Sequence, residues 1–148
     1  MPYKAKKSLR FLPLPLIVVL VIGGCCVLPR VLPYSPSELA ALNKLNTDTL
    51  ALMDKAGDSP TLHSADIANL RIELKTAYQN ALARSKKNPI AQNLATLSDP
   101  QKPLLSWFLD KWTASSNGLD QMVIESTESN VKDILNICID EENSFPKQ

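Results

Sequence analysis

Residues that catalysis and metal binding usually require are scarce in this chain. Its 148 residues include one histidine, three cysteines and four glycines. A structural zinc site needs four ligands, mostly cysteine and histidine, and a phosphate-binding loop needs several closely spaced glycines. The sequence contains no G-x-S-x-G or Glu-x-x-His pattern. We therefore predict no catalytic residue, no metal site and no cofactor, and we expect a protein that is not an enzyme.

The sequence also lacks a strand-like pattern and a large excess of either positive or negative charge. No segment alternates apolar and polar residues for long enough to indicate a β-strand. The formal net charge is +1, but four of the sixteen basic residues lie in the first ten positions. The remainder has twelve basic and fifteen acidic residues, near −3. A mildly acidic domain lacks the basic footprint of a nucleic-acid-binding protein.

The chain does have a long apolar run close to its start. Lys4, Lys6, Lys7 and Arg10 precede an uncharged segment at residues 11–28. Three interpretations fit this pattern: a cleaved secretory signal, an uncleaved membrane anchor or a lipoprotein signal. As a helix, 18 residues would be roughly 27 Å long, just enough to span a bilayer core of about 30 Å. In each case the cations stay in the cytoplasm and the rest is exported.

The end of the apolar run favours the lipoprotein signal. Ile22-Gly23-Gly24-Cys25 resembles the lipobox of small bacterial lipoproteins, in which an aliphatic residue and two small residues precede the lipidated cysteine. The register selects Cys25, because Cys26 would have a glycine at the aliphatic position. The resemblance implies a lipid, including palmitate, on Cys25. Cys26 is not the aspartate that retains such lipoproteins in the inner membrane, so the outer membrane is favoured and the inner membrane stays open.

The rest of the chain predicts a short spacer and a helical domain. Pro29, Pro33 and Pro36 punctuate residues 29–36. They indicate a semi-extended tether, residues 29–35, between the leader, residues 1–28, and the domain, residues 36–148. Helical periodicity and capping patterns predict an all-α antiparallel bundle of four main helices and one short helix. The expected spans are 36–56, 64–87, 90–97 (the short one), 100–117 and 120–140, with a frayed end from Glu141 to Pro146.

Three side chains in this domain deserve a functional interpretation beside a structural one. His63 precedes a helix start, where a loop residue is the simpler interpretation. Cys138 falls on an apolar stripe and is expected to be a buried thiol, with an intermolecular disulfide as the alternative. Trp107 and Trp112 are five positions apart and cannot share one helix face. We therefore expect Trp107 to be partly exposed. Packing at a helix junction is the simpler interpretation of this residue, and a contact with a partner is the functional one.

Together these features favour a membrane-tethered interaction protein of the bacterial cell envelope. The resemblance to small lipoproteins implies an assembly factor, an exclusion or immunity protein, or an inhibitor. The expected partners are membrane lipid, through Cys25 or residues 11–28, and another envelope protein; a homo-oligomer is also open. The alternative is a single-pass bundle with a cytoplasmic N-terminus that binds an apolar ligand or a membrane protein, since Ala77 and Ala81 on a core stripe could leave room between helices.

Overall fold

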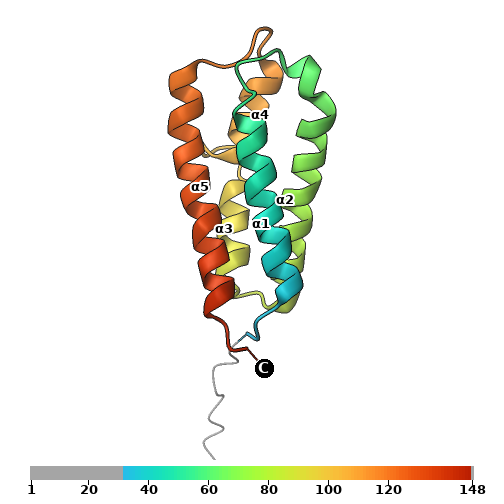
Figure 1. Ribbon diagram of the computed structural model, residues 1–148, viewed down its shortest axis with the longest axis vertical. Coiled ribbons are helices and arrows are strands. Elements are labelled where there is room, and N and C mark those ends of the chain that lie inside the picture. Colours follow the sequence, from blue (N-terminus) through green and yellow to red (C-terminus); the bar gives the residue numbers. More distant parts are fainter. Residues whose placement is uncertain (1–31, 148) are drawn as a thin grey trace, which may run out of the picture. The chain divides into compact units, whose positions relative to one another are not determined.

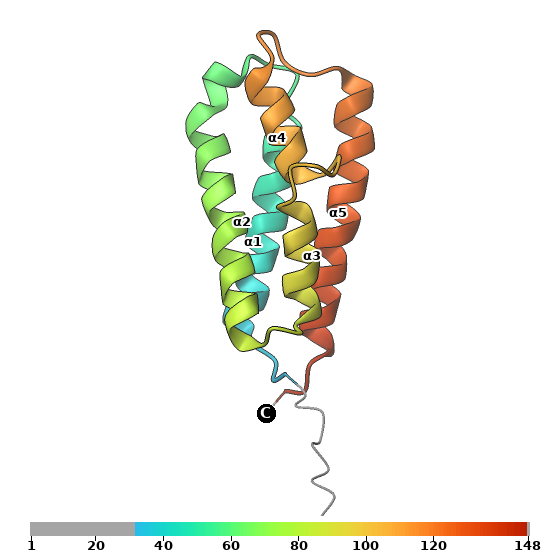
Figure 2. The ribbon, with the colours of Figure 1, turned by 180° about the vertical axis from the view of Figure 1, so that it is seen from behind.

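A computed structural model describes residues 32–147 of the chain, and these residues form a helical bundle. Three long helices, α1 (Pro36–Met53), α2 (Ser64–Arg84) and α5 (Gln121–Ser144), occupy three positions of the bundle. The fourth is shared by α3 (Pro89–Leu97) and α4 (Leu105–Ala114), which follow one another along the bundle (Figure 1, Figure 2). The predicted all-α bundle is confirmed. The predicted leader, the Cys25 lipid site and residues 29–31 of the spacer lie outside the described residues.

Successive arms of the bundle run antiparallel, so both ends of the described chain meet at one end (Figure 1). There the backbone N–H of Tyr34 donates to the carbonyl of Pro146 at 3.1 Å. We call this the terminal end. The opposite, distal end holds the turn between α1 and α2, which includes a short 3-10 helix (Pro60–His63), and the loop between α4 and α5.

Local sequence signals explain where the helices begin. The hydroxyl of Ser35 accepts from the N–H of Glu38 at 3.3 Å and so caps α1. Asn88 and Asp120 do the same for α3 and α5 through Ile90 and Met122. Proline at the first position of α1 and of α3 costs no hydrogen bond, because that N–H has no partner within the helix.

The fourth helix begins later than the sequence suggested, at Leu105 rather than near Pro100. The N–H groups of Gln101 and Lys102 bond to the side chain and carbonyl of Asp99, which forms a turn instead of a helix. Pro103 then prevents its neighbour from adopting helical geometry. These residues separate α3 from α4 and divide the fourth arm of the bundle in two.

A close backbone contact joins the two distal loops. Gly118 has φ +90°, and a Cβ there would lie 2.1 Å from the carbonyl oxygen of Gly57. Next to it, Leu119 donates its N–H to the carbonyl of Ala56 at 2.7 Å. Gly118 therefore permits the close contact between the two distal loops. It lies four residues beyond the end of α4, although the sequence predicts that the helix ends here.

The core is built almost entirely from leucine, isoleucine, alanine and two aromatic residues. Helical spacing in the sequence predicts an apolar stripe on α2, and all five of its residues are buried: Ile67, Leu70, Leu74, Ala77 and Ala81. On α5, helical spacing predicts a stripe that consists of Ile124, Thr127, Val131, Ile134 and Cys138. Four of these residues are buried, whereas Ile134 is only half-buried and its neighbour Leu135 is fully buried. Within residues 32–147, none of the helices combines the length and the apolar character needed to cross a bilayer.

Candidate functional site

A buried charge cluster lies at the terminal end, where α1, α2 and α5 meet. Glu142, in the last turn of α5, is 0% exposed. The guanidinium of Arg84, from the last turn of α2, donates to both oxygens of this carboxylate, with 3.2 Å between Nη2 and Oε1. The N–H of Ser35 donates to the same Oε1 at 2.6 Å. The positive charge of Arg84 and these hydrogen bonds thus compensate the free-energy cost of burying the Glu142 carboxylate.

Glu38, in the first turn of α1, adds a second carboxylate to this cluster. Its side chain is only 8% exposed, and its Oε2 lies 3.6 Å from Nη1 of Arg84. Its other oxygen, Oε1, has no hydrogen-bond partner among the described residues. Burial raises the pKa of Glu38, the charge of Glu142 raises it further, and Arg84 opposes both effects. Two carboxylates therefore share one guanidinium.

Arg84 also attaches the start of the described chain to the bundle. Its Nη2 donates to the carbonyl of Pro33, and its guanidinium lies 5.4 Å from the ring centroid of Phe145. Residues 33–35, predicted as the last part of the spacer, are therefore hydrogen-bonded to the bundle. The predicted frayed end is wrong, because α5 continues to Ser144 and Glu142 is buried.

An open cavity of about 320 Å³ lies beside this cluster, between the first turns of α1 and the last turns of α2. We call it the terminal cavity. Its polar lining consists of Ser35, Ser37, Glu38, Asn80 and Arg84. The apolar lining is formed by three alanines, Ala41, Ala77 and Ala83, together with Leu42. Ala77 thus lines a cavity, as the sequence allowed, whereas Ala81 is 0% exposed in the core.

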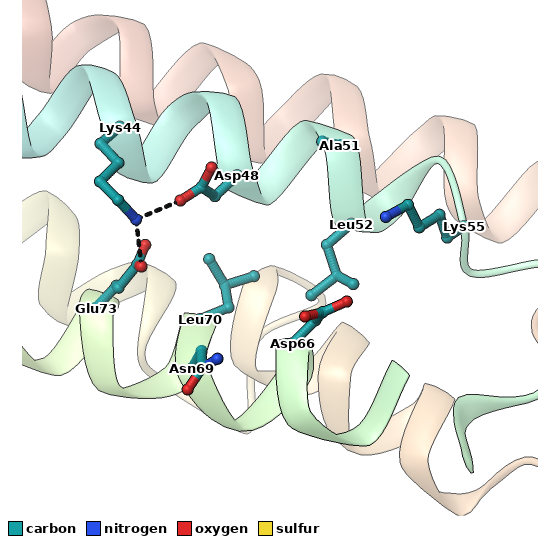
Figure 3. A pocket seen from close by; sticks show the side chains of 9 residues that line it. All are labelled: Lys44, Asp48, Ala51, Leu52, Lys55, Asp66, Asn69, Leu70 and Glu73. Carbon is teal, nitrogen blue, oxygen red and sulfur yellow. Dashed lines mark hydrogen bonds and ion pairs between the residues drawn. The ribbon is translucent and has the colours of Figure 1, made fainter. Parts of the chain in front are cut away.

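A second cavity of about 350 Å³, the central groove, lies further along the same pair of helices (Figure 3). Lys44 bridges Asp48 of its own helix and Glu73 of α2, with Nζ to oxygen distances of 2.5 Å each. These carboxylates raise the pKa of Lys44. Because a protonated amine has no free electron pair, Lys44 is unsuited to act as a nucleophile or general base here.

The contacts of His63, the only histidine of the chain, indicate a structural role. Nε2 of His63 lies 3.1 Å from a carboxylate oxygen of Asp58, and its ring centroid is 5.6 Å from that of Trp112. Trp112 in turn donates its indole N–H to the carbonyl of Asp58 at 3.0 Å. No group of three or more histidine, cysteine, aspartate or glutamate side chains in residues 32–147 is arranged to hold a metal ion.

Cys138 and Trp107 are placed as their helical spacing predicts, the first buried and the second partly exposed. Cys138 is fully buried, and burial raises the pKa of its thiol to about 12. Trp112 is 0% exposed, whereas Trp107 is half-buried with Nζ of Lys111 5.6 Å from its ring centroid. The partner contact at Trp107 stays a prediction.

Sequence reasoning assigned each residue of the charge cluster a local role only. Glu38 lies three positions after Ser35 and fits the second half of a capping box, Arg84 fits a cation at a helix end, and Glu142 falls in the predicted frayed end. One signal could have identified the last of these. Glu142 continues the apolar stripe of α5 at helical spacing, four positions after Cys138.

No protein-family model, curated protein or solved structure matches the chain.

Proposed function

We propose that this chain is a membrane-tethered helical interaction protein of the bacterial cell envelope, held by a lipid on Cys25. The lipobox-like sequence and the basic residues before it support the tether. In the bundle, the buried polar groups of the charge cluster hold the fold together, and Lys44 in the central groove is protonated. These features favour binding to another protein over catalysis.

One observation carries the proposal: the chain enters and leaves the bundle at the same end. Tyr34 is hydrogen-bonded to Pro146, and Arg84 holds Pro33. Only seven residues separate Cys25 from Pro33, so the eight steps between them span at most about 29 Å in extended conformation. A lipid on Cys25 would therefore keep the terminal end near the membrane and leave the distal end free for a partner.

The distal end carries the most exposed large apolar side chains of the described residues. Leu62, in the 3-10 helix, is 74% exposed, and Met122, in the first turn of α5, is 77% exposed. A mostly apolar cavity of about 160 Å³ lies nearby, lined by Pro60, Ile67 and Thr113 among others. Exposed apolar side chains beside a cavity are typical of partner contacts.

The tether is tested by membrane fractionation, labelling with radioactive palmitate and intact mass. We expect Cys25→Ala to lose the label and to release the protein from membranes, whereas Cys26→Ala should retain both. A mature chain that begins at Cys25 and carries a diacylglyceryl or triacyl group is expected. Unlabelled protein that stays in the membrane as Cys25→Ala would instead support the single-pass alternative.

The partner surface is tested by photo-crosslinking in cells. A photoreactive residue at position 62 or 122 is expected to give a discrete adduct with an envelope protein, and position 107 tests the predicted contact of Trp107. Ile72, 62% exposed on the side of α2, is the matched control position. Adducts of equal yield at all four positions would contradict a specific distal surface.

A further inference from the structure

The loop between α4 and α5, at the distal end, contains an asparagine that is followed by glycine, Asn117-Gly118 (Figure 1). Asparagine is one of the chemically labile residues of proteins. The backbone nitrogen of the next residue can attack the side-chain amide carbon, and glycine favours this attack because it has no Cβ to obstruct it. The loop therefore contains two neighbouring residues that can react with each other without an enzyme.

The structure hinders this reaction at the other nine asparagines of the chain. Eight of them lie within helices: Asn43, Asn46, Asn69, Asn80, Asn93, Asn130, Asn136 and Asn143. In a helix the attacking N–H donates to a carbonyl four residues earlier, and the helical dihedral angles hold it away from the side-chain amide. The ninth, Asn88, precedes Pro89, which has no N–H. The reaction is thus open at Asn117 alone.

The surroundings of Asn117 favour the reaction. Asn117 is exposed and lies between two helices, three residues after the end of α4. The N–H of Gly118 has no hydrogen-bond partner within residues 32–147, so no such bond has to break before the nitrogen attacks. The next residue is fixed, because the N–H of Leu119 donates to the carbonyl of Ala56 at 2.7 Å. The reactive pair therefore comes directly before an anchored position.

We propose that Asn117 is a site of spontaneous deamidation that loosens the contact between the two distal loops. The nitrogen of Gly118 loses its proton to hydroxide and bonds to Cγ of Asn117, and the side-chain nitrogen leaves as ammonia. This step closes a succinimide ring. Water then adds to one of the two ring carbonyls and breaks the bond from that carbon to the nitrogen. Opening at Cγ gives aspartate, whereas opening at the backbone carbonyl gives isoaspartate, in which the main chain runs through Cβ and Cγ.

Isoaspartate lengthens the main chain by one atom directly before Gly118, where the two loops are in close contact. A Cβ at Gly118 would lie 2.1 Å from the carbonyl oxygen of Gly57 and 2.8 Å from that of Asp58. The longer main chain has to shift Gly118 or Leu119, and a shift of Leu119 weakens its bond to Ala56. The inference does not depend on the proposed tether or partner, because both loops belong to the bundle itself.

The site is tested by ageing the full chain in nonionic detergent and mapping its peptides by mass spectrometry. An amide that becomes an acid is detected by its small mass increase, and isoaspartate is identified with a protein isoaspartate methyltransferase. We expect Asn117 to be converted at least about tenfold faster than Asn143, which also precedes a small residue but lies in α5. The rate at Asn117 should rise with pH, since hydroxide removes the proton of Gly118. In urea its rate should stay nearly the same, whereas the rate at Asn143 should increase.

Two variants separate the chemistry from its structural effect. Asn117→Gln is the matched control, because it keeps the amide but has to close a larger ring, and its mass and urea midpoint should not change on ageing. Asn117→Asp carries the charge of the products without the added main-chain atom, and its midpoint should stay close to that of the unmodified chain. The isoaspartate fraction, separated by chromatography, should unfold at a lower urea concentration than Asn117→Asp.

Three results would overturn the proposal. The first is conversion of Asn117 no faster than that of Asn143 in the folded chain. The second is conversion of Asn117 much slower in the folded chain than in urea, which would show that the loop protects it. The third is an isoaspartate fraction with the same urea midpoint as Asn117→Asp, which would show that the distal contact accommodates the longer main chain.

Discussion

Single side chains at the terminal end have effects beyond their own contacts, and Glu142 is the clearest case. Glu142→Ala leaves Arg84 without its main partner in a mostly buried position. We expect a loss of about 3 kcal/mol in the free energy of unfolding, because breaking a buried ion pair leaves an uncompensated charge. Urea unfolding measures this loss. Asp140→Ala, at an exposed position of the same helix, should change stability by less than about 0.5 kcal/mol.

The pH dependence of stability should report on Glu38. Its folded-state pKa is raised, so the folded chain binds more protons than the unfolded chain between the two values. This contribution to stability is complete below the ordinary pKa of about 4.5 and is lost as the pH rises through the raised value. Glu38→Gln cannot titrate. Relative to the unmodified chain, its stability should therefore improve from pH 4 to pH 8; a constant difference across this range would show that burial of Glu38 is not costly.

Glycine 118 is the position where the backbone tolerates no side chain. Gly118→Ala is expected to cost at least about 2 kcal/mol, since φ +90° strains an alanine and its Cβ would collide with the carbonyl of Gly57. Gly57→Ala is the control, because a Cβ there meets no atom within 4 Å. The urea midpoint should fall sharply for the first variant only. Equal midpoints would mean that the two distal loops separate without cost.

At the scale of elements, the junction of α2 with α3 depends on a single buried amide. Asn88 is 0% exposed; its oxygen caps α3 through the N–H of Ile90 at 3.1 Å, and its nitrogen donates to the carbonyl of Ala81 at 2.9 Å. Asn88→Ala removes both bonds; it leaves the N–H of Ile90 without its cap, and the carbonyl of Ala81 keeps only the longer bond from the N–H of Ser85, at 3.4 Å. We expect a loss of about 2 kcal/mol. Asn130→Ala, which removes one exposed bond within α5, should be nearly neutral in the same thermal or urea unfolding experiment.

Most of the elements could be predicted, because each signal is local. Capping residues, prolines and helical spacing identified five helices, and the stripe of α2 matches the buried set in full. The late start of α4 was missed because it depends on the turn around Asp99. The charge cluster was missed for a different reason. Glu38, Arg84 and Glu142 come from three helices, and only the antiparallel arrangement brings them together.

At the scale of the whole bundle, Cys138 should report on global unfolding. Its side chain is fully buried and its pKa is raised to about 12, so little thiolate forms in the folded state. We expect the Cys138 thiol to react with a thiol reagent only after the bundle opens. Its labelling rate should fall with every stabilising condition. Rapid labelling under native conditions would show that α5 separates from the bundle locally.

The hydrogen bond between Tyr34 and Pro146 has a practical consequence for engineering. In a variant limited to residues 32–147, the two ends lie side by side and can be joined by a short linker, and new ends can be opened elsewhere without changing the helix packing. The turn around Asp99 is suited to the new ends, because it already separates two short helices that act as one arm. Such a circular permutant would remove the old C-terminus and present the bundle with its distal loops intact.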